Sequence, residues 1–270
     1  MKIFILLFFL ILASCSKMDL ALKWADWMIV KETDSYFDLS DTQNKELKNQ
    51  VQKDLSRVKK ENFPDIAKFL SKVAGQIEAD KISLEEIAKL QTEFQITVKA
   101  ALNQFQSTAL DFAMKATAEQ IEHFKKKYNQ QTEKHADDVK TEKDKFKLQK
   151  KRFEKWTDEW LGGLTSEQKV ALASDIKEVP FPWDLQVRSR EVSLNKFLEA
   201  RRSRALLKAY MDQLEDERDP EYEKALKDYQ AHLRIYILKL YQSLNKDQKT
   251  YLTKKLRDRA HEFEGLAREP

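Results

Sequence analysis

A short polar pattern recurs four times along the chain: a small hydrogen-bonding residue is followed three positions later by a glutamine. In such a capping box, the first side chain accepts a hydrogen bond from the third backbone N–H of a helix, and the glutamine bonds back to the cap. An acidic residue in the first turn of each box favours the positive end of the helix. The sequence therefore predicts four helix starts, capped by Ser40, Thr117, Thr165 and Asn245 and closed by Gln43, Gln120, Gln168 and Gln248.

The chain has few residues of the kinds that form tight turns. Only 4 glycines and 5 prolines occur in 270 residues, too few for a multi-stranded β-protein or a glycine-rich nucleotide-binding domain. Its content of 35% charged and 41% hydrophobic residues is typical of amphipathic helices with solvated outer faces. We therefore predict an all-α fold, an elongated multi-helix bundle. The net charge of +4 is too weak and too dispersed to indicate a nucleic-acid partner.

The spacing of the four caps is consistent with an internal repeat. The first and third caps are 125 residues apart, and the second and fourth are 128 residues apart. Two similar helical halves would produce these matched intervals. Independent reuse of a good cap would produce them as well, and the sequence leaves both explanations open.

The composition changes between residues 129 and 155, where 15 of 27 residues are charged. The apolar side chains Val139, Phe146 and Phe153 recur every seven residues there, and the series continues to Trp160. This pattern predicts a long, projecting charged helix over 129–161 that connects an N-terminal half, 15–128, to a C-terminal half, 162–270. Its apolar seam is either the inner edge of a solvated linking helix, which we favour over a coiled-coil dimer, or a partner-binding surface.

A basic cluster lies in the C-terminal half at Arg201, Arg202 and Arg204. It could attract anionic lipid headgroups or an acidic partner. Because acidic residues lie nearby in the sequence, we favour a salt-bridged helix face. Together with the three residues of the apolar seam, these arginines are the candidate partner-binding residues of the chain.

The first residues predict export and lipid attachment. Lys2 precedes an unbroken apolar run over 3–12, the length of a signal-peptide core and too short to span a bilayer. The run ends in Leu-Ala-Ser-Cys, which resembles the bacterial lipobox. We therefore expect residues 1–14 to be a lipoprotein signal peptide and Cys15, the only cysteine, to carry the lipid. Ser16 at the next position resembles outer-membrane sorting, so we expect an anchor in the outer membrane with the protein facing the periplasm.

An apolar stripe follows shortly after this cysteine. Leu20, Trp24, Trp27 and Met28 lie at helical spacing. The stripe either packs in the core or lies on the membrane. Few lysines accompany it, fewer than an interfacial helix usually carries, so we favour core packing.

No catalytic or metal-binding signature is recognisable in the sequence. Its histidines are spread along the chain without an i, i+4 pair, at His123, His135, His232 and His261. The glycine motifs of serine hydrolases, P-loop proteins and dinucleotide-binding domains are missing. We expect no enzymatic activity, no cofactor and no metal site.

Two family resemblances complete the sequence evidence. Residues 34–40, Asp-Ser-Tyr-Phe-Asp-Leu-Ser, with Ala-Asp-Trp at 25–27, resemble the N-terminal pattern of an uncharacterised family of proteobacterial helical lipoproteins. Leu-Thr-Ser-Glu-Gln at 164–168 matches the Leu-Thr-x-x-Gln signature of the Spy and CpxP type of periplasmic chaperone and stress-response protein, and the other boxes resemble it in part.

The Spy-like resemblance implies a tethered helical cradle that holds other proteins. We therefore expect a lipid-anchored, periplasm-facing binding protein of the bacterial envelope with chaperone-like or stress-related activity. Its expected partners are the membrane, through the acyl chains, and an envelope protein or an unfolded client. The alternative is a structural lipoprotein that scaffolds an envelope complex.

Overall fold

The computed structural model describes residues 22–214 and 217–268, and all regular elements in these ranges are helices. This confirms the predicted all-α fold. The signal peptide, Cys15 and Leu20 lie outside the described residues, so their predicted roles stay predictions.

The N-terminal half is a run of helices with short connections. One π-helix, η1, joins α4 to α5 without an intervening loop. The first helix, α3, ends at Phe37, and the Ser40 cap then begins α4. The elements are α3 (Ala25–Phe37), α4 (Asp41–Arg57), η1 (Val58–Asn62), α5 (Phe63–Glu78), α6 (Leu84–Asn103), α7 (Gln106–Lys115) and α8 (Ala118–Asp138).

The C-terminal half repeats this order. Its first helix, α9, also ends shortly before a capping box, and its last helix, α14, also follows one. The elements are α9 (Glu142–Leu161), α10 (Ser166–Glu178), α11 (Trp183–Ala200), α12 (Arg204–Asp212), α13 (Pro220–Ser243) and α14 (Lys246–Arg268).

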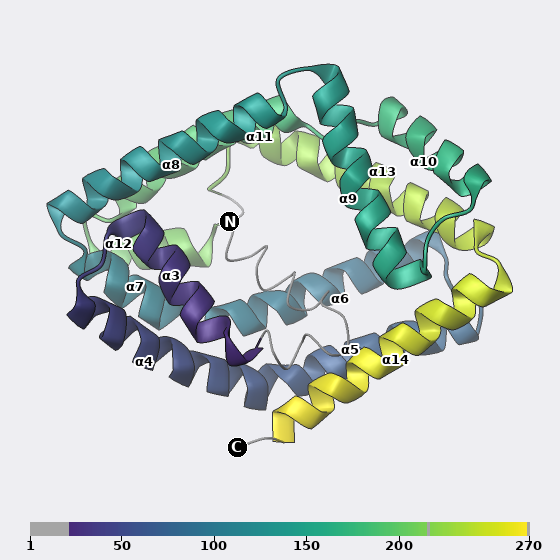
Figure 1. Ribbon diagram of the computed structural model, residues 1–270, viewed down its shortest axis with the longest axis horizontal. Coiled ribbons are helices and arrows are strands. Elements are labelled where there is room, and N and C mark those ends of the chain that lie inside the picture. Colours follow the sequence, from purple (N-terminus) through teal and green to yellow (C-terminus); the bar gives the residue numbers. More distant parts are fainter. Residues whose placement is uncertain (1–21, 215–216, 269–270) are drawn as a thin grey trace.

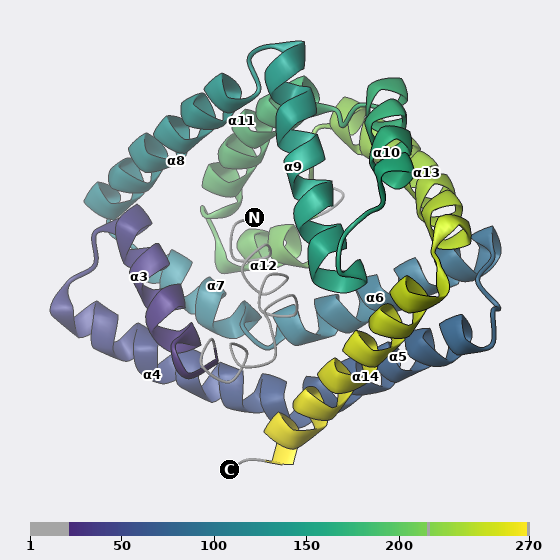
Figure 2. The ribbon, with the colours of Figure 1, turned by 45° about the vertical axis from the view of Figure 1, so that its right-hand side comes forward.

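The helices are arranged around a ring rather than along a single bundle axis (Figure 1, Figure 2). The chain runs around the ring and returns, so that α14 lies along α5 in both views. The main core lies where these two helices meet α9, α10 and α13. Phe63 and Phe263 pack edge to face there, with ring centroids 4.9 Å apart. Smaller cores lie between α3 and α4 and between α7, α11 and α12.

Contacts between the halves are reciprocal. The last helix of each half packs on the first helix of its own half and on the middle helix of the other: α8 contacts α3 and α11, and α14 contacts α9 and α5. In the same way α7 contacts α4 and α12, and α13 contacts α10 and α6. A reused cap does not determine which distant helices pack together. The repeated order of contacts therefore favours a duplication of one helical unit.

The predicted long helix over 129–161 is wrong. Helix α8 ends at Asp138, and Thr141 begins α9 as a new N-cap, accepting a hydrogen bond from the Asp144 backbone N–H at 3.2 Å. Val139, with a φ of −124°, leaves the helical conformation at the junction and is only 2% exposed. Burial of this β-branched side chain stabilises a break at that position.

The apolar seam of α9 belongs to the body of the protein. Phe153 packs edge to face on Tyr236, with ring centroids 5.3 Å apart, and Trp160 is buried in the main core. Phe146 also packs against this core. The segment is therefore a wall of the ring and does not project from it.

Candidate functional site

All four predicted capping boxes are present. Ser40, Thr117 and Thr165 each accept a hydrogen bond from the backbone N–H of the glutamine three residues later, at 3.3 Å in every case. Asn245 does the same for Gln248 at 2.8 Å. Each glutamine Oε1 accepts a hydrogen bond from the backbone N–H of its own cap, at 2.9 to 3.2 Å.

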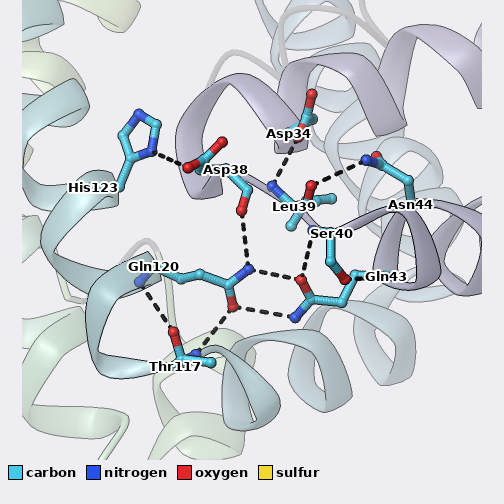
Figure 3. A network of polar contacts seen from close by, with 9 residues as sticks. All are labelled: Asp34, Asp38, Leu39, Ser40, Gln43, Asn44, Thr117, Gln120 and His123. Carbon is cyan, nitrogen blue, oxygen red and sulfur yellow. Dashed lines mark hydrogen bonds and ion pairs between the residues drawn. The ribbon is translucent and has the colours of Figure 1, made fainter.

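The boxes meet in two pairs, which was not predicted. In the first joint, defined as the contact between Gln43 of α4 and Gln120 of α8, each side-chain amide donates to the other's Oε1 (Figure 3). The two Nε2–Oε1 distances are 3.2 and 2.8 Å. The second N–H of Gln120 bonds to the carbonyl oxygen of Asp38, two residues before the partner cap. The joint thereby fixes the start of α4 against the start of α8.

The second joint has the same construction. Gln168 of α10 and Gln248 of α14 donate to each other's Oε1 at 3.0 and 2.9 Å. Gln168 also donates to the carbonyl oxygen of Ser243, and Gln248 to that of Gly163, each two residues before the partner cap. Every N–H of both amides therefore has an acceptor.

The two joints differ in their exposure to solvent. Gln168 and Gln248 are 7% and 8% exposed, whereas in the first joint Gln120 is 8% exposed and Gln43 is half-buried. The first joint opens onto a surface hollow lined by acidic side chains and His123, whose Nδ1 lies 4.0 Å from an Asp38 carboxylate oxygen (Figure 3).

The acidic residue after each threonine cap is in an equivalent environment in the two joints. Hydrogen bonds from its own backbone N–H and from the Thr117 hydroxyl lower the pKa of Glu119 below its ordinary value. The same two kinds of hydrogen bond, with Thr165 as the hydroxyl, lower the pKa of Glu167. Both carboxylates are therefore stabilised in the charged form at a helix N-terminus.

Chemically, each joint consists of two neutral amides that form hydrogen bonds with each other and with the backbone. Such a buried, satisfied network specifies which helix ends meet. It joins the start of α4 to that of α8, and the start of α10 to that of α14. Sequence reasoning identified each box but not the pairing; the paired boxes are 77 and 80 residues apart, and these two similar intervals were the signal that could have suggested it.

The six candidate partner-binding residues are not brought together on one surface. Val139 is buried, and Phe146 and Phe153 are half-buried and pack against the main core, so the partner-binding role of this seam stays a prediction. Much of the apolar surface of these side chains is used in the protein's own packing.

The arginines instead bind other parts of the chain. Arg201 donates to backbone carbonyls of Ala113 and Ala116 at the end of α7. Arg204 pairs with Asp111 at 2.6 Å, and Arg202 lies 3.8 Å from Glu199. These contacts support the salt-bridged helix face over a binding site for anions.

The predicted core packing of the tryptophan stripe is also wrong. Trp24 is 54% exposed and Trp27 is 47% exposed, while Ala25 and Ile29 of the same helix are buried. Two apolar stripes lie side by side on α3, and helical spacing alone did not tell which of them faces the core.

Two further observations concern residues 22–214 and 217–268 only. No group of three or more histidine, cysteine, aspartate and glutamate side chains is placed to hold a metal ion. No helix there combines the length and the apolar character that crossing a bilayer requires.

The fold and the joints define a class: an all-α ring of two similar halves, each with a pair of interlocked capping boxes. The chain belongs to a family of unknown function, DUF6279, whose sequence model matches residues 35–229. This match confirms the expectation of an uncharacterised family and includes the first three capping boxes. No curated protein and no solved structure matches the chain.

Proposed function

We propose that this protein is a lipid-anchored binding protein of the bacterial envelope that faces the periplasm and holds unfolded client proteins. Cys15 carries the anchor, in the outer membrane as the following serine suggests. Several acyl chains hold a protein stably, because each buried CH₂ contributes about 0.8 kcal/mol.

The observation that carries the proposal is the pattern of exposed apolar side chains on the ring. Three of them lie on different helices, each close in sequence to an exposed lysine: Ile96 with Lys99, Val170 with Lys169, and Leu206 with Lys208. Ile96 and Val170 are 65% and 72% exposed. Tight binding to one partner relies on a cluster of apolar anchors, so dispersed apolar side chains beside positive charges suit weak binding to many unfolded chains better.

The resemblance of the capping boxes to the Leu-Thr-x-x-Gln signature supports the same function. In this protein the boxes join the helix ends and so keep the ring in shape while its outer faces remain accessible. A rigid frame with dispersed contact sites can bind a client without closing around a single sequence.

The client-binding test uses the full mature protein. At a near-stoichiometric ratio it should suppress aggregation of an unrelated denatured protein, and the double variant Ile96→Ser with Val170→Ser should lose at least half of this effect. The matched control, Ile96→Leu with Val170→Leu, keeps the apolar area and should remain active. Unchanged aggregation together with capture of one defined envelope partner would instead support the scaffold function.

The anchor is tested separately. The Cys15→Ser variant should accumulate as an unprocessed precursor and should not label with a fatty-acid analogue. The thiol is the only group in the chain that can form the thioether. Normal labelling of the variant contradicts the lipoprotein assignment.

A further inference from the structure

Helix α3 has one face in the core and one face in solvent. Ala25, Ile29 and Val30 are buried, and the latter two pack in the small core with Leu47 and Val51 of α4. The other face presents Trp24 and Trp27, which contact each other edge to face with ring centroids 6.0 Å apart.

We propose that this outer face of α3 rests on the surface of the membrane that holds the Cys15 anchor. The inference depends on the proposed lipid attachment and adds a second, non-covalent membrane contact to it. Its occupant is the headgroup region of the bilayer.

The paired indoles are the first argument. Trp24 and Trp27 are both about half exposed and contact each other, so they form one patch. Tryptophan is enriched where a membrane meets water, because its ring is apolar and its N–H bonds to polar headgroups. Two adjacent exposed indoles are costly in water and well placed at such an interface.

The charges around the patch are the second argument. The Lys31 ammonium lies over the Trp27 ring, 4.5 Å from its centroid, and can reach anionic headgroups beside it. The nearby acid, Asp26, is turned toward α4, where it accepts a hydrogen bond from Gln52 at 2.7 Å and lies 3.9 Å from Lys48. The negative charge is thus held on the inner side of α3.

Chain length is the third argument. Nine residue steps separate Cys15 from Trp24, which span at most about 30 Å when fully extended. A lipid-bearing cysteine lies in the headgroup region, so the start of α3 cannot move far from the bilayer surface. The tether therefore raises the effective concentration of the membrane at this face of α3.

The test measures tryptophan emission in vesicles. Full-length mature protein is reconstituted into phosphatidylcholine and phosphatidylglycerol vesicles with or without dibrominated phosphatidylcholine, a short-range quencher. The emission of Trp24 and Trp27 is obtained by difference from the Trp24→Phe, Trp27→Phe variant. We expect the brominated lipid to reduce this difference emission at least twofold. The remaining emission, from Trp156, Trp160 and Trp183, should be unchanged.

A control variant and a separate measurement make the result decisive. Trp156→Phe removes a half-buried indole of α9 and should leave the quenched component intact. If the difference emission is not quenched in protein that carries the fatty-acid label, the inference is wrong, and a blue shift without quenching assigns the patch to a protein surface. Failure of the label itself contradicts the proposed anchor and is detected by labelling, not by fluorescence.

Discussion

The joint between α4 and α8 and the joint between α10 and α14 use the same chemical groups in the same order, yet one is open and the other is closed. In both, two glutamine amides bond to each other and to their own caps. Only in the second are both amides buried and fully satisfied. The comparison shows that a local motif sets the geometry of a joint, while its surroundings set how far the joint is exposed to solvent.

Equivalent positions explain the difference. Two residues before the cap, the first joint has Asp38 and the second has Gly163; three residues after the second glutamine, the first joint has His123 and the second has Tyr251. The Tyr251 ring lies close to the neighbouring Gly162, 3.8 Å from where a Cβ would be. The Tyr251 ring covers one side of this glycine turn. An aspartate and a histidine keep their polar groups in solvent.

The largest expected effect comes from truncating one amide in each joint. Gln168→Ala should leave one buried amide N–H of Gln248 without its acceptor and also remove the bonds to Thr165 and Ser243, at a cost of about 3 kcal/mol, since an unsatisfied buried group costs about 1 to 3 kcal/mol. Gln43→Ala removes a half-buried amide that water can replace, so it should lower the free energy of unfolding by only about 1 kcal/mol. Urea unfolding of both variants measures the difference. Equal losses would show that burial does not distinguish the joints.

The glycine turn of the second joint is the next point of comparison. Gly163 has a φ of 111°, a conformation that side chains rarely adopt, so Gly163→Ala should cost about 2 kcal/mol. Asp38 of the first joint has a φ of 52°, and Asp38→Gly should stabilise the fold by about 0.5 kcal/mol through relief of that conformation. Thermal unfolding gives both values. The two substitutions should change stability in opposite directions, and a destabilised Asp38→Gly variant would contradict this account.

The caps themselves should not distinguish the joints. The Ser40, Thr117 and Thr165 hydroxyls lie at the same 3.3 Å from the backbone nitrogen to which they bond. Replacement of each by alanine should therefore cost about 1 kcal/mol in either half. Denaturant midpoints at constant slope test this. A much larger loss at Thr165 alone would place the difference between the joints in the caps, not in the glutamines.

How well a feature could be predicted from the sequence depends on how far apart in the chain its interacting residues lie. The caps depend on residues three apart and were found correctly. The Gln168–Gln248 contact joins residues 80 apart, and its one sequence signal is the similar spacing of 77 residues between Gln43 and Gln120. The break at Val139 and the exposure of Trp24 were missed because both depend on which neighbouring helix supplies the core. On α3, Ala25 and Ile29 face the core, and helical spacing alone does not tell which of the two apolar stripes of this helix is buried.

The smallest expected effect concerns the acids after the threonine caps. Because the pKa values of Glu119 and Glu167 are lowered in the fold, their stabilising contribution is present above the ordinary pKa of a glutamate and is lost as the pH falls through the folded value. Glu119→Gln and Glu167→Gln should each lower stability slightly at pH 7, by less than a cap substitution because both carboxylates are exposed and screened by salt. The difference from the unaltered protein should shrink as the pH falls from 5 to 3. Urea midpoints across this range, at low and high salt, measure it. Since the two carboxylates have the same partners, the two variants should behave alike, and a loss confined to Glu167 would show that the closed joint also alters the electrostatics of its helix end.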